Sequence, residues 1–173
     1  MNSISKGEYD NCKFTDCDFS NVNLSNIVFV ESEFVNCNFS MAKIKNTALK
    51  DVRFINCKLL GLIFNDCDSF LLMLYFEDCH INFASFFKLI LKNTDFKNCN
   101  LQEADFTDAD LSNSTFDNCN LERTIFVNTN LEKTDFTTSH NYSFDPEINK
   151  IKKAKFTQFG VLGLLDKFDI TIK

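Results

Sequence analysis

Large apolar residues return at every fifth position over most of this chain of 173 residues. One run of such positions extends from Phe14 to Phe64 and a second from Phe76 to Phe136, and every position in both runs is Phe, Leu or Ile. An α-helix with about 3.6 residues per turn would scatter these side chains around its axis. A single strand would point successive ones to opposite faces. The period therefore predicts a repeated unit of five residues instead of either element.

The cysteines indicate how many units make one coil. All eight lie two residues before a position of the fivefold series. Two sets are spaced by twenty residues, namely Cys17, Cys37 and Cys57, and then Cys79, Cys99 and Cys119. Twenty residues make four units, so each coil has four sides. From Phe86 to Phe136 the repeated residue alternates between Phe and Leu, which places Phe on two opposite sides of a square.

This square coil predicts an all-β solenoid, a parallel β-helix. The repeated residue, which we call the centre, points inward together with the small residue two places before it, and the other three residues face water. Coils stacked at about 4.8 Å pair their backbones with the coils on either side. About seven coils give a rod about 30 Å long. The sequence has only four Gly and one Pro, so other residue types must form the corners.

The register of the repeat slips once. Phe64 and Phe76 are twelve residues apart, two more than two units require. The segment between them, DSFLLMLYF at 68–76, must therefore bulge from the wall, and it is apolar. We favour a bulge that folds over outward apolar residues of the neighbouring coils: Leu60, Ile63, Phe83, Phe87 and Ile90. The alternative is an exposed apolar patch of the kind that marks partner sites, with these candidate contact residues: Phe70, Met73, Tyr75, Phe83 and Phe87.

The end of the chain departs from the repeat. We expect a loop at 139–148, a last partial coil at 149–156, a short helix from Thr157 to about Lys167 and a strand at 169–173. The chain then divides into a β-helix at 1–158 and a C-terminal cap at 159–173. The cap either buries the last coil or forms a two-fold dimer interface through Val161, Leu162, Leu164, Leu165 and Phe168.

The units ADFTD and ADLSN, residues 104–113, resemble the A(D/N)LXX motif of the pentapeptide-repeat family, and CNLER, TNLEK and CNFSM are variants of it. The resemblance covers residues 9–138 and 149–158. It implies a right-handed, quadrilateral β-helix. The segment GLLDKFDITI is similar to the C-terminal segment of Qnr-like and MfpA-like members. The resemblance to those members implies a homodimer formed by the cap, a rod that imitates duplex DNA, and DNA gyrase as the protein partner.

The charge of the chain limits how much of the rod could imitate duplex DNA. The net charge of −6 and the pI of about 4.9 exclude general binding to nucleic acids or to an anionic membrane. Duplex DNA of about 30 Å carries roughly eighteen charges, so only part of the rod could imitate it. That part is 98–122, which has six acids and no base: Glu103, Asp105, Asp108, Asp110, Asp117 and Glu122. Residues 43–58 are basic instead. A scaffold that binds a partner through the apolar patch is the alternative function.

The chain offers little material for catalysis. Its cysteines form no C-x-x-C pair, its only histidines are His80 and His140, and it has no Gly-rich phosphate loop. We therefore expect no enzyme activity, no metal site and no cofactor, and we interpret the cysteines as small inward residues. The opening residues MNSISKGEYDNCKF lack the apolar core of a signal peptide, and the longest apolar run, 70–76, is too short to span a bilayer. A cytoplasmic protein with reduced thiols is the expectation.

Overall fold

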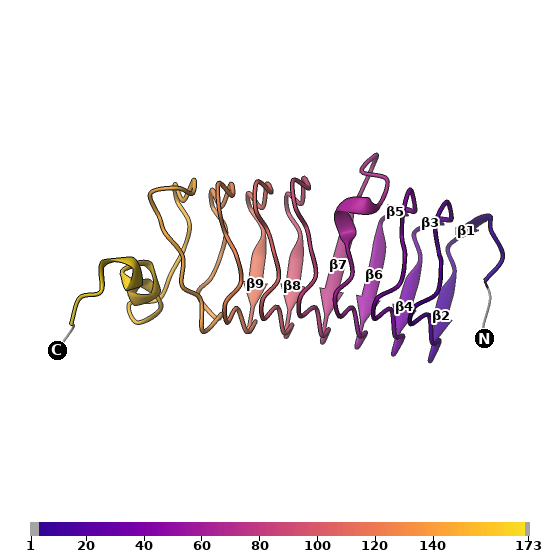
Figure 1. The fold of residues 1–173 in the computed structure, drawn as a ribbon, viewed down its shortest axis with the longest axis horizontal. Coiled ribbons are helices and arrows are strands. Elements are labelled where there is room, and N and C mark those ends of the chain that lie inside the picture. The colour runs from indigo at the N-terminus through magenta and orange to yellow at the C-terminus, as the bar shows by residue number, and fades with distance from the viewer. Residues whose placement is uncertain (1–3, 172–173) are drawn as a thin grey trace.

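The chain forms a rod of stacked coils whose two ends lie at opposite ends of the molecule (Figure 1). The computed structural model describes residues 4–171. All strand pairing is parallel, in a three-stranded sheet of order β1-β3-β5 and a six-stranded sheet of order β2-β4-β6-β7-β8-β9. The predicted all-β parallel solenoid is confirmed. Its strands are β1 (Glu8–Asp10), β2 (Lys13–Thr15), β3 (Val28–Val30), β4 (Glu33–Val35), β5 (Ala48–Lys50), β6 (Val52–Ile55), β7 (Leu74–Glu77), β8 (Asp95–Lys97) and β9 (Thr115–Asp117).

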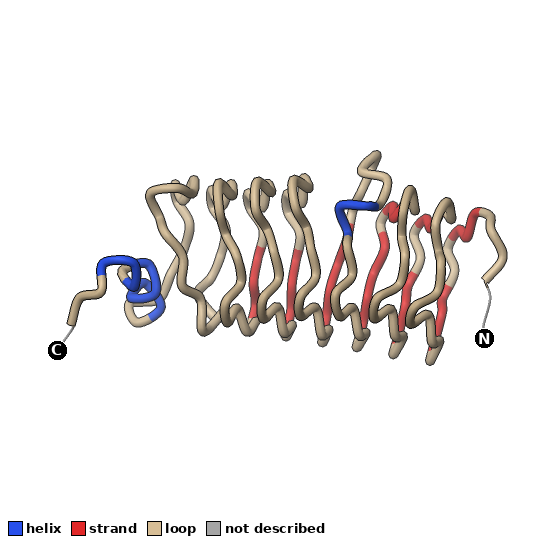
Figure 2. The backbone as a smooth tube through the Cα atoms, in the orientation of Figure 1, coloured by secondary structure: helices blue, strands red, loops and turns tan. Residues whose placement is uncertain are grey.

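We name the four sides of the coil by the inward residues stacked along each of them. Side A holds Phe34, Phe54, Phe76, Phe96, Phe116 and Phe136. Side B holds Phe39, Leu59, Ile81, Leu101 and Leu121. Side C holds Ile44, Phe64, Phe86, Phe106 and Phe126. Side D holds Phe29, Leu49, Leu91, Leu111 and Leu131. Regular strands lie on sides A and D, and isolated bridges connect much of the remaining wall (Figure 2).

The rod has about six turns, one for each strand of the large sheet, close to the expected number of about seven. The wall is irregular near the C-terminal end. His140 still pairs with Asn120, but the next residues leave the wall, and Tyr142 and Phe144 turn inward where two regular sides would stand. Regular pairing resumes where Lys150 meets Asn130.

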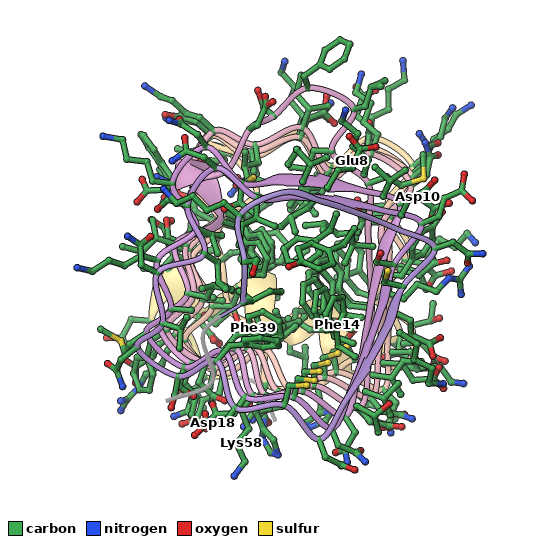
Figure 3. All side chains as sticks on the ribbon, turned by 90° about the vertical axis from the view of Figure 1, so that its right-hand side faces the viewer. Glu8, Asp10, Phe14, Asp18, Phe39 and Lys58 are labelled. Atoms are coloured by element: carbon green, nitrogen blue, oxygen red, sulfur yellow. The ribbon has the colours of Figure 1, made fainter. Side chains whose placement is uncertain are left out.

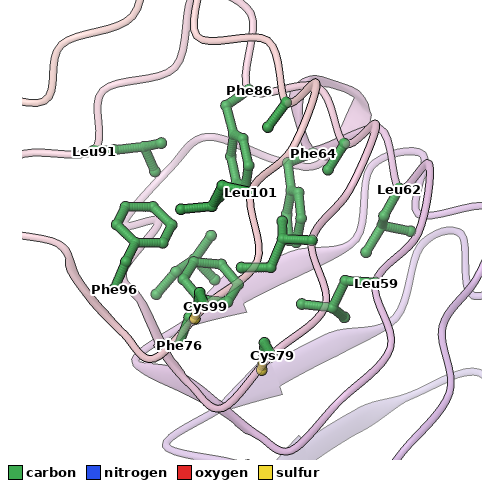
Figure 4. Close-up of a cluster of buried hydrophobic side chains, with 14 of the residues drawn as sticks. Leu59, Leu62, Phe64, Phe76, Cys79, Phe86, Leu91, Phe96, Cys99 and Leu101 are labelled. Atoms are coloured by element: carbon green, nitrogen blue, oxygen red, sulfur yellow. The ribbon is translucent and has the colours of Figure 1, made fainter. Parts of the chain in front are cut away.

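Stacked aromatic rings fill the interior of the rod. The ring of Phe96 lies between those of Phe76 and Phe116, with centroid separations of 5.0 and 4.9 Å and nearly parallel planes. The ring of Phe106, on the opposite side of the square, meets it edge-on at 5.9 Å. Such pairs each add about 0.5–1.5 kcal/mol to the gain from burying the rings. The prediction that Phe occupies two opposite sides is therefore confirmed, and Figure 4 shows the same arrangement one coil earlier.

Left-handed residues form the corners. The residue two places after nearly every centre has a positive φ, for example Asn93 at 58°, Asn113 at 61° and Arg123 at 55°. Most side chains are strained in this region, whereas Asn and Asp tolerate it because their short polar side chains bond locally. The backbone N–H of Asn113 then donates to Glu132 of the next coil at 2.9 Å. A chain with few glycines can therefore turn four corners in every coil.

The C-terminal segment forms 3₁₀ turns, and the described part of the chain contains no α-helix, so the predicted helix is wrong in type. The 3₁₀ helices are η1 (Phe64–Asp66), η2 (Gly160–Leu164) and η3 (Asp166–Phe168). The N-cap residue of η2 is Phe159, not the expected Thr157, although the Thr157 Oγ1 accepts a hydrogen bond from the Gly160 N–H at 2.8 Å. A Cβ at Gly163 would collide with the Tyr142 carbonyl. Glycines that allow this close contact also disfavour an α-helix.

The predicted strand at 169–173 is not formed by its described residues. Asp169 is left-handed with φ of 47°, and residues 169–171 belong to no strand. Residues 172–173 lie outside the described part of the chain.

The stacked rings predict a strong dependence of stability on position along the rod. Phe96→Ala should lower the free energy of unfolding by about 3–5 kcal/mol, because it removes a fully buried ring from the middle of a stack. Phe14→Ala should cost clearly less, because Phe14 is only half-buried at the first coil. Urea unfolding followed by circular dichroism measures both changes. Equal losses in the two variants would contradict this account of the core.

The corners predict an unusual response to substitution. Asn113→Val should lower the free energy of unfolding by about 1–2 kcal/mol, because a β-branched residue is forced into the left-handed region. Asn113→Gly should have little effect, because glycine adopts that region without strain. Thermal melting of the two variants checks the expectation. A valine variant as stable as the glycine variant would show that the left-handed conformation at this corner does not limit the stability of the fold.

Candidate binding surfaces

The six acids predicted as a binding surface wind around the rod and do not form one patch. Asp105 lies on side C in the column that joins Ser85 to Ile125, and Asp110 lies on side D. Asp117 lies in β9 on side A, and Glu122 follows Leu121 on side B. A flat partner surface can face only one or two sides of a square rod at once. It would meet only some of these carboxylates.

Several of the six carboxylates also have partners within the chain. Glu103 pairs with Arg123 at 3.6 Å, and Asp110 pairs with Lys92 at 3.3 Å. Asp105 accepts the backbone N–H of Thr107 at 2.8 Å, and Asp117 accepts the hydroxyl of Thr138 at 2.8 Å. The negative charge that this band presents to a partner is therefore weaker than the sequence indicates.

The register slip produces an exposed loop on side D. Asp68 still pairs with Ala48 of the preceding coil, after which the chain projects from the rod and returns at β7 (Figure 1). Phe70, Leu71 and Met73 are 65%, 64% and 50% exposed. Ile90, on the same side of the next coil, is 67% exposed. We call these four residues the loop patch. The favoured prediction, in which the bulge buries itself over its neighbours, is wrong.

The five residues predicted as an apolar patch lie on different sides of the rod. Phe70 and Met73 belong to the loop patch, but Tyr75 lies in β7 on side A, with the Arg53 guanidinium 4.7 Å from its ring centre. Phe83 is exposed at the corner between sides B and C. Phe87 lies on side C, with the Lys88 ammonium group 4.7 Å from its ring. Leu71 and Ile90 are the members of the loop patch that the predicted set omitted.

The proposed dimer residues do not form a shared apolar face. Leu164 is buried within its own chain, at 6% exposure, whereas Val161, Leu162 and Phe168 are exposed and Leu165 is half-buried. The Lys167 ammonium group pairs with Asp145 at 2.7 Å and with Glu147 at 2.6 Å. The segment is thus held against the loop that precedes the last coil. A helical dimer interface is not supported.

The residues predicted from the sequence as functional did not include a column of polar residues on the corner between sides A and B. The Asn56 side-chain amide donates to Asn36 at 2.8 Å, and Asn36 donates to Asp16 at 3.0 Å. Asn118 and Asn98 continue this pattern in later coils. These hydrogen bonds lie along the stacking direction and join successive coils. The twenty-residue spacing of Asn was the signal that could have identified them.

The cysteines of side B form a column inside the wall, and Figure 3 shows their sulfur atoms in a row along the rod. Cys57 and Cys119 are fully buried, and the Sγ of each lies 3.4 Å from a carbonyl oxygen of the preceding coil. Cys67 lies outside this column, on side D, where burial, followed by the nearby Asp68 charge, raises its pKa to about 12. Contact with the Cys57 thiol and then burial raise the pKa of Cys37. Within residues 4–171, no group of three or more His, Cys, Asp or Glu side chains is placed to hold a metal ion.

Comparison with known proteins defines the class. The family model for the pentapeptide repeat region matches residues 6–86 and 47–126, so the chain belongs to the pentapeptide-repeat family. No curated protein sequence matches it. No helix in the described part of the chain has the length and apolar character needed to cross a membrane.

Solved structures confirm the fold. A trypsin-treated variant of QnrB1, a plasmid-mediated fluoroquinolone resistance protein, is 19% identical, with a TM-score of 0.70 over 96% of this chain and 90% of that one. Full-length QnrB1 is 19% identical, with a TM-score of 0.67 over 94% of this chain and 90% of that one. The predicted resemblance to Qnr-like members is confirmed at the level of the fold.

The buried column predicts selective alkylation. At pH 8, iodoacetamide should label Cys12 and Cys17, which are half-exposed at the first coils. Cys57, Cys67 and Cys99 should remain unlabelled, because they are buried and because their raised pKa values keep the thiols protonated. Mass spectrometry of peptides locates the label, and denatured protein, in which all eight cysteines should react, is the control. Labelling of folded Cys57 as fast as Cys17 would contradict the buried column.

Proposed function

We propose that this protein is a non-enzymatic binding module that contacts another protein through the loop patch, and that DNA gyrase is this partner. The exposed loop patch carries the proposal. Monomeric proteins seldom expose several large apolar residues together, and such patches typically mark protein-binding sites. Phe70 and Leu71 are each more than 60% exposed, and their loop projects from an otherwise regular wall (Figure 1).

Gyrase is proposed as the partner from the resemblance to Qnr-like proteins and from the shared fold with QnrB1, which is a fluoroquinolone resistance protein. Fold alone does not fix function, so the proposal also needs a contact surface on this chain. The acidic band around 98–122 is a weaker candidate for that surface. Its carboxylates are spread over four sides, and Glu103 and Asp110 are in ion pairs.

Binding through the loop patch and binding through acids that imitate DNA should depend differently on salt concentration. Contacts between exposed charges weaken as ionic strength rises, whereas apolar contacts do not. If the loop patch dominates, binding should change little between low and moderate salt. If the acids dominate, it should weaken steeply and depend on Asp105 and Asp108.

The test is DNA supercoiling by gyrase, titrated with this protein at low and moderate salt, with and without a fluoroquinolone. We expect inhibition of supercoiling or protection from the drug at micromolar protein. The Phe70→Ser, Leu71→Ser double variant should reduce this effect about tenfold or more, because central apolar anchors dominate binding energy. The matched control is Ile125→Ser, Ile148→Ser, which removes two exposed apolar side chains elsewhere.

Each result has a separate meaning. The effect on gyrase could instead be sensitive to salt, unchanged in the Phe70→Ser, Leu71→Ser variant and lost in the Asp105→Asn, Asp108→Asn variant. The contact surface would then be the acidic band and not the loop patch. No effect of the unaltered protein on gyrase would reject gyrase as the partner.

A further inference from the structure

A second irregularity of the same coil lies on the corner between sides B and C. Three successive coils carry an apolar residue or glycine at this corner: Met41, Gly61 and Phe83. Other coils carry polar or charged residues there: Asn21, Glu103 and Arg123. All six share the left-handed conformation, so the backbone does not require glycine or an apolar residue. Met41 and Phe83 are 62% and 58% exposed.

Gly61 leaves room at this corner for the Met41 side chain. A Cβ at Gly61 would approach the Met41 Sδ to 2.7 Å, so the Met41 side chain occupies the space that a side chain at position 61 would take. On side C, Asp66 belongs to η1, whereas Asn46 and Lys88 at the equivalent places are left-handed corners. The coil with the register slip therefore stacks imperfectly on the coils before it.

The result is a groove of about 520 Å³, which we call the corner groove. Its lining includes Met41, Lys43, Lys45, Gly61, Ile63 and Asp66. Two lysines face one carboxylate in this lining, in a protein whose net charge is −6. Lys43 and Lys45 are exposed, and neither forms an ion pair with a carboxylate in residues 4–171.

We propose that the corner groove binds an extended acidic segment of a partner protein, with an apolar side chain of that segment seated between Met41 and Ile63. Charge complementarity assigns the occupant, because the two lysines can each meet a carboxylate on either side of the apolar anchor. Lys43 and Lys45 flank the inward residue Ile44, so both project outward from side C. The groove is distinct from the loop patch, which lies on side D, and the proposal does not depend on gyrase.

The test uses a short fluorescein-labelled peptide of alternating Asp and Leu residues, with fluorescence anisotropy as the readout. The peptide should bind the unaltered protein, and binding should weaken as salt increases. A peptide with Lys in place of Asp should not bind. The Lys43→Glu, Lys45→Glu double variant should weaken binding at least about tenfold, or about 1.4 kcal/mol.

The chain contains a matched control. Lys150, Ile151 and Lys152 repeat the Lys-Ile-Lys pattern in the last coil, away from the groove. Lys150→Glu, Lys152→Glu changes the net charge equally and should bind the peptide like the unaltered protein. Equal losses in the two double variants would overturn the proposal, because binding would then follow net charge alone. No binding by the unaltered protein would also overturn it.

A third variant tests the role of Met41 at this corner. Gly61→Asn places at this corner a residue that already stands at Asn21 with nearly the same φ, 58° against 62°, so the fold should be retained, and thermal melting verifies this. Its side chain should displace the Met41 side chain from its present place and weaken peptide binding severalfold. Unchanged binding by a folded variant would contradict an apolar anchor at this place.

Discussion

Each coil must have the same circumference if its backbone is to pair with the coils before and after it. Twenty residues meet that condition in most of the rod, and strand registers such as Glu33 with Arg53 follow directly. The slip coil has two extra residues, yet Phe54 still pairs with Phe76 and their rings stack at 5.6 Å. The surplus is confined to side D, where it forms the loop. Matching the circumference thus preserves the stack of Phe rings, while the wall of this coil departs from the regular pattern on side D and beside η1 on side C.

The same constraint explains the choice of inward residues. Each coil adds one layer, so every layer must hold similar volume. From residue 94 to residue 134 the small inward position is Cys, Ala, Ser or Thr, and the polar members are satisfied within the wall, whereas larger residues such as Ile27, Leu62 and Leu89 are buried there in earlier coils. Thr124 Oγ1 donates to Leu101 O at 2.9 Å and Thr129 Oγ1 to Phe106 O at 2.9 Å. Cys57 has a carbonyl oxygen at 3.4 Å in the same direction. A cysteine here is therefore a buried small residue, and its chemistry is suppressed by the wall around it.

Regular coils leave few places for a specific contact. Outward residues on a square rod are divided among four sides, which separates Asp105 from Asp117 although they are only twelve residues apart in the sequence. Both proposed contact regions occur instead where the slip coil departs from the regular wall. The loop patch lies on side D of that coil and of the next, and the corner groove lies beside η1 on side C. The slip coil thus contributes to two local surfaces without disturbing the stack of Phe rings.

The square coil, the stacking of Phe on opposite sides and the position of the slip could all be predicted from the sequence, because a strict period leaves one way to bury every centre residue. The scarcity of glycine likewise required corners built from other residues. The sequence did not reveal that Phe70 and Leu71 stay exposed, that the six acids are divided among the sides, or that the segment after Thr157 forms 3₁₀ turns. These outcomes depend on contacts between coils. Each of these contacts joins residues about twenty apart in the sequence, and no local pattern specifies such pairs. Examples are Gly163 with the Tyr142 carbonyl, Gly61 with Met41, and Lys167 with Asp145.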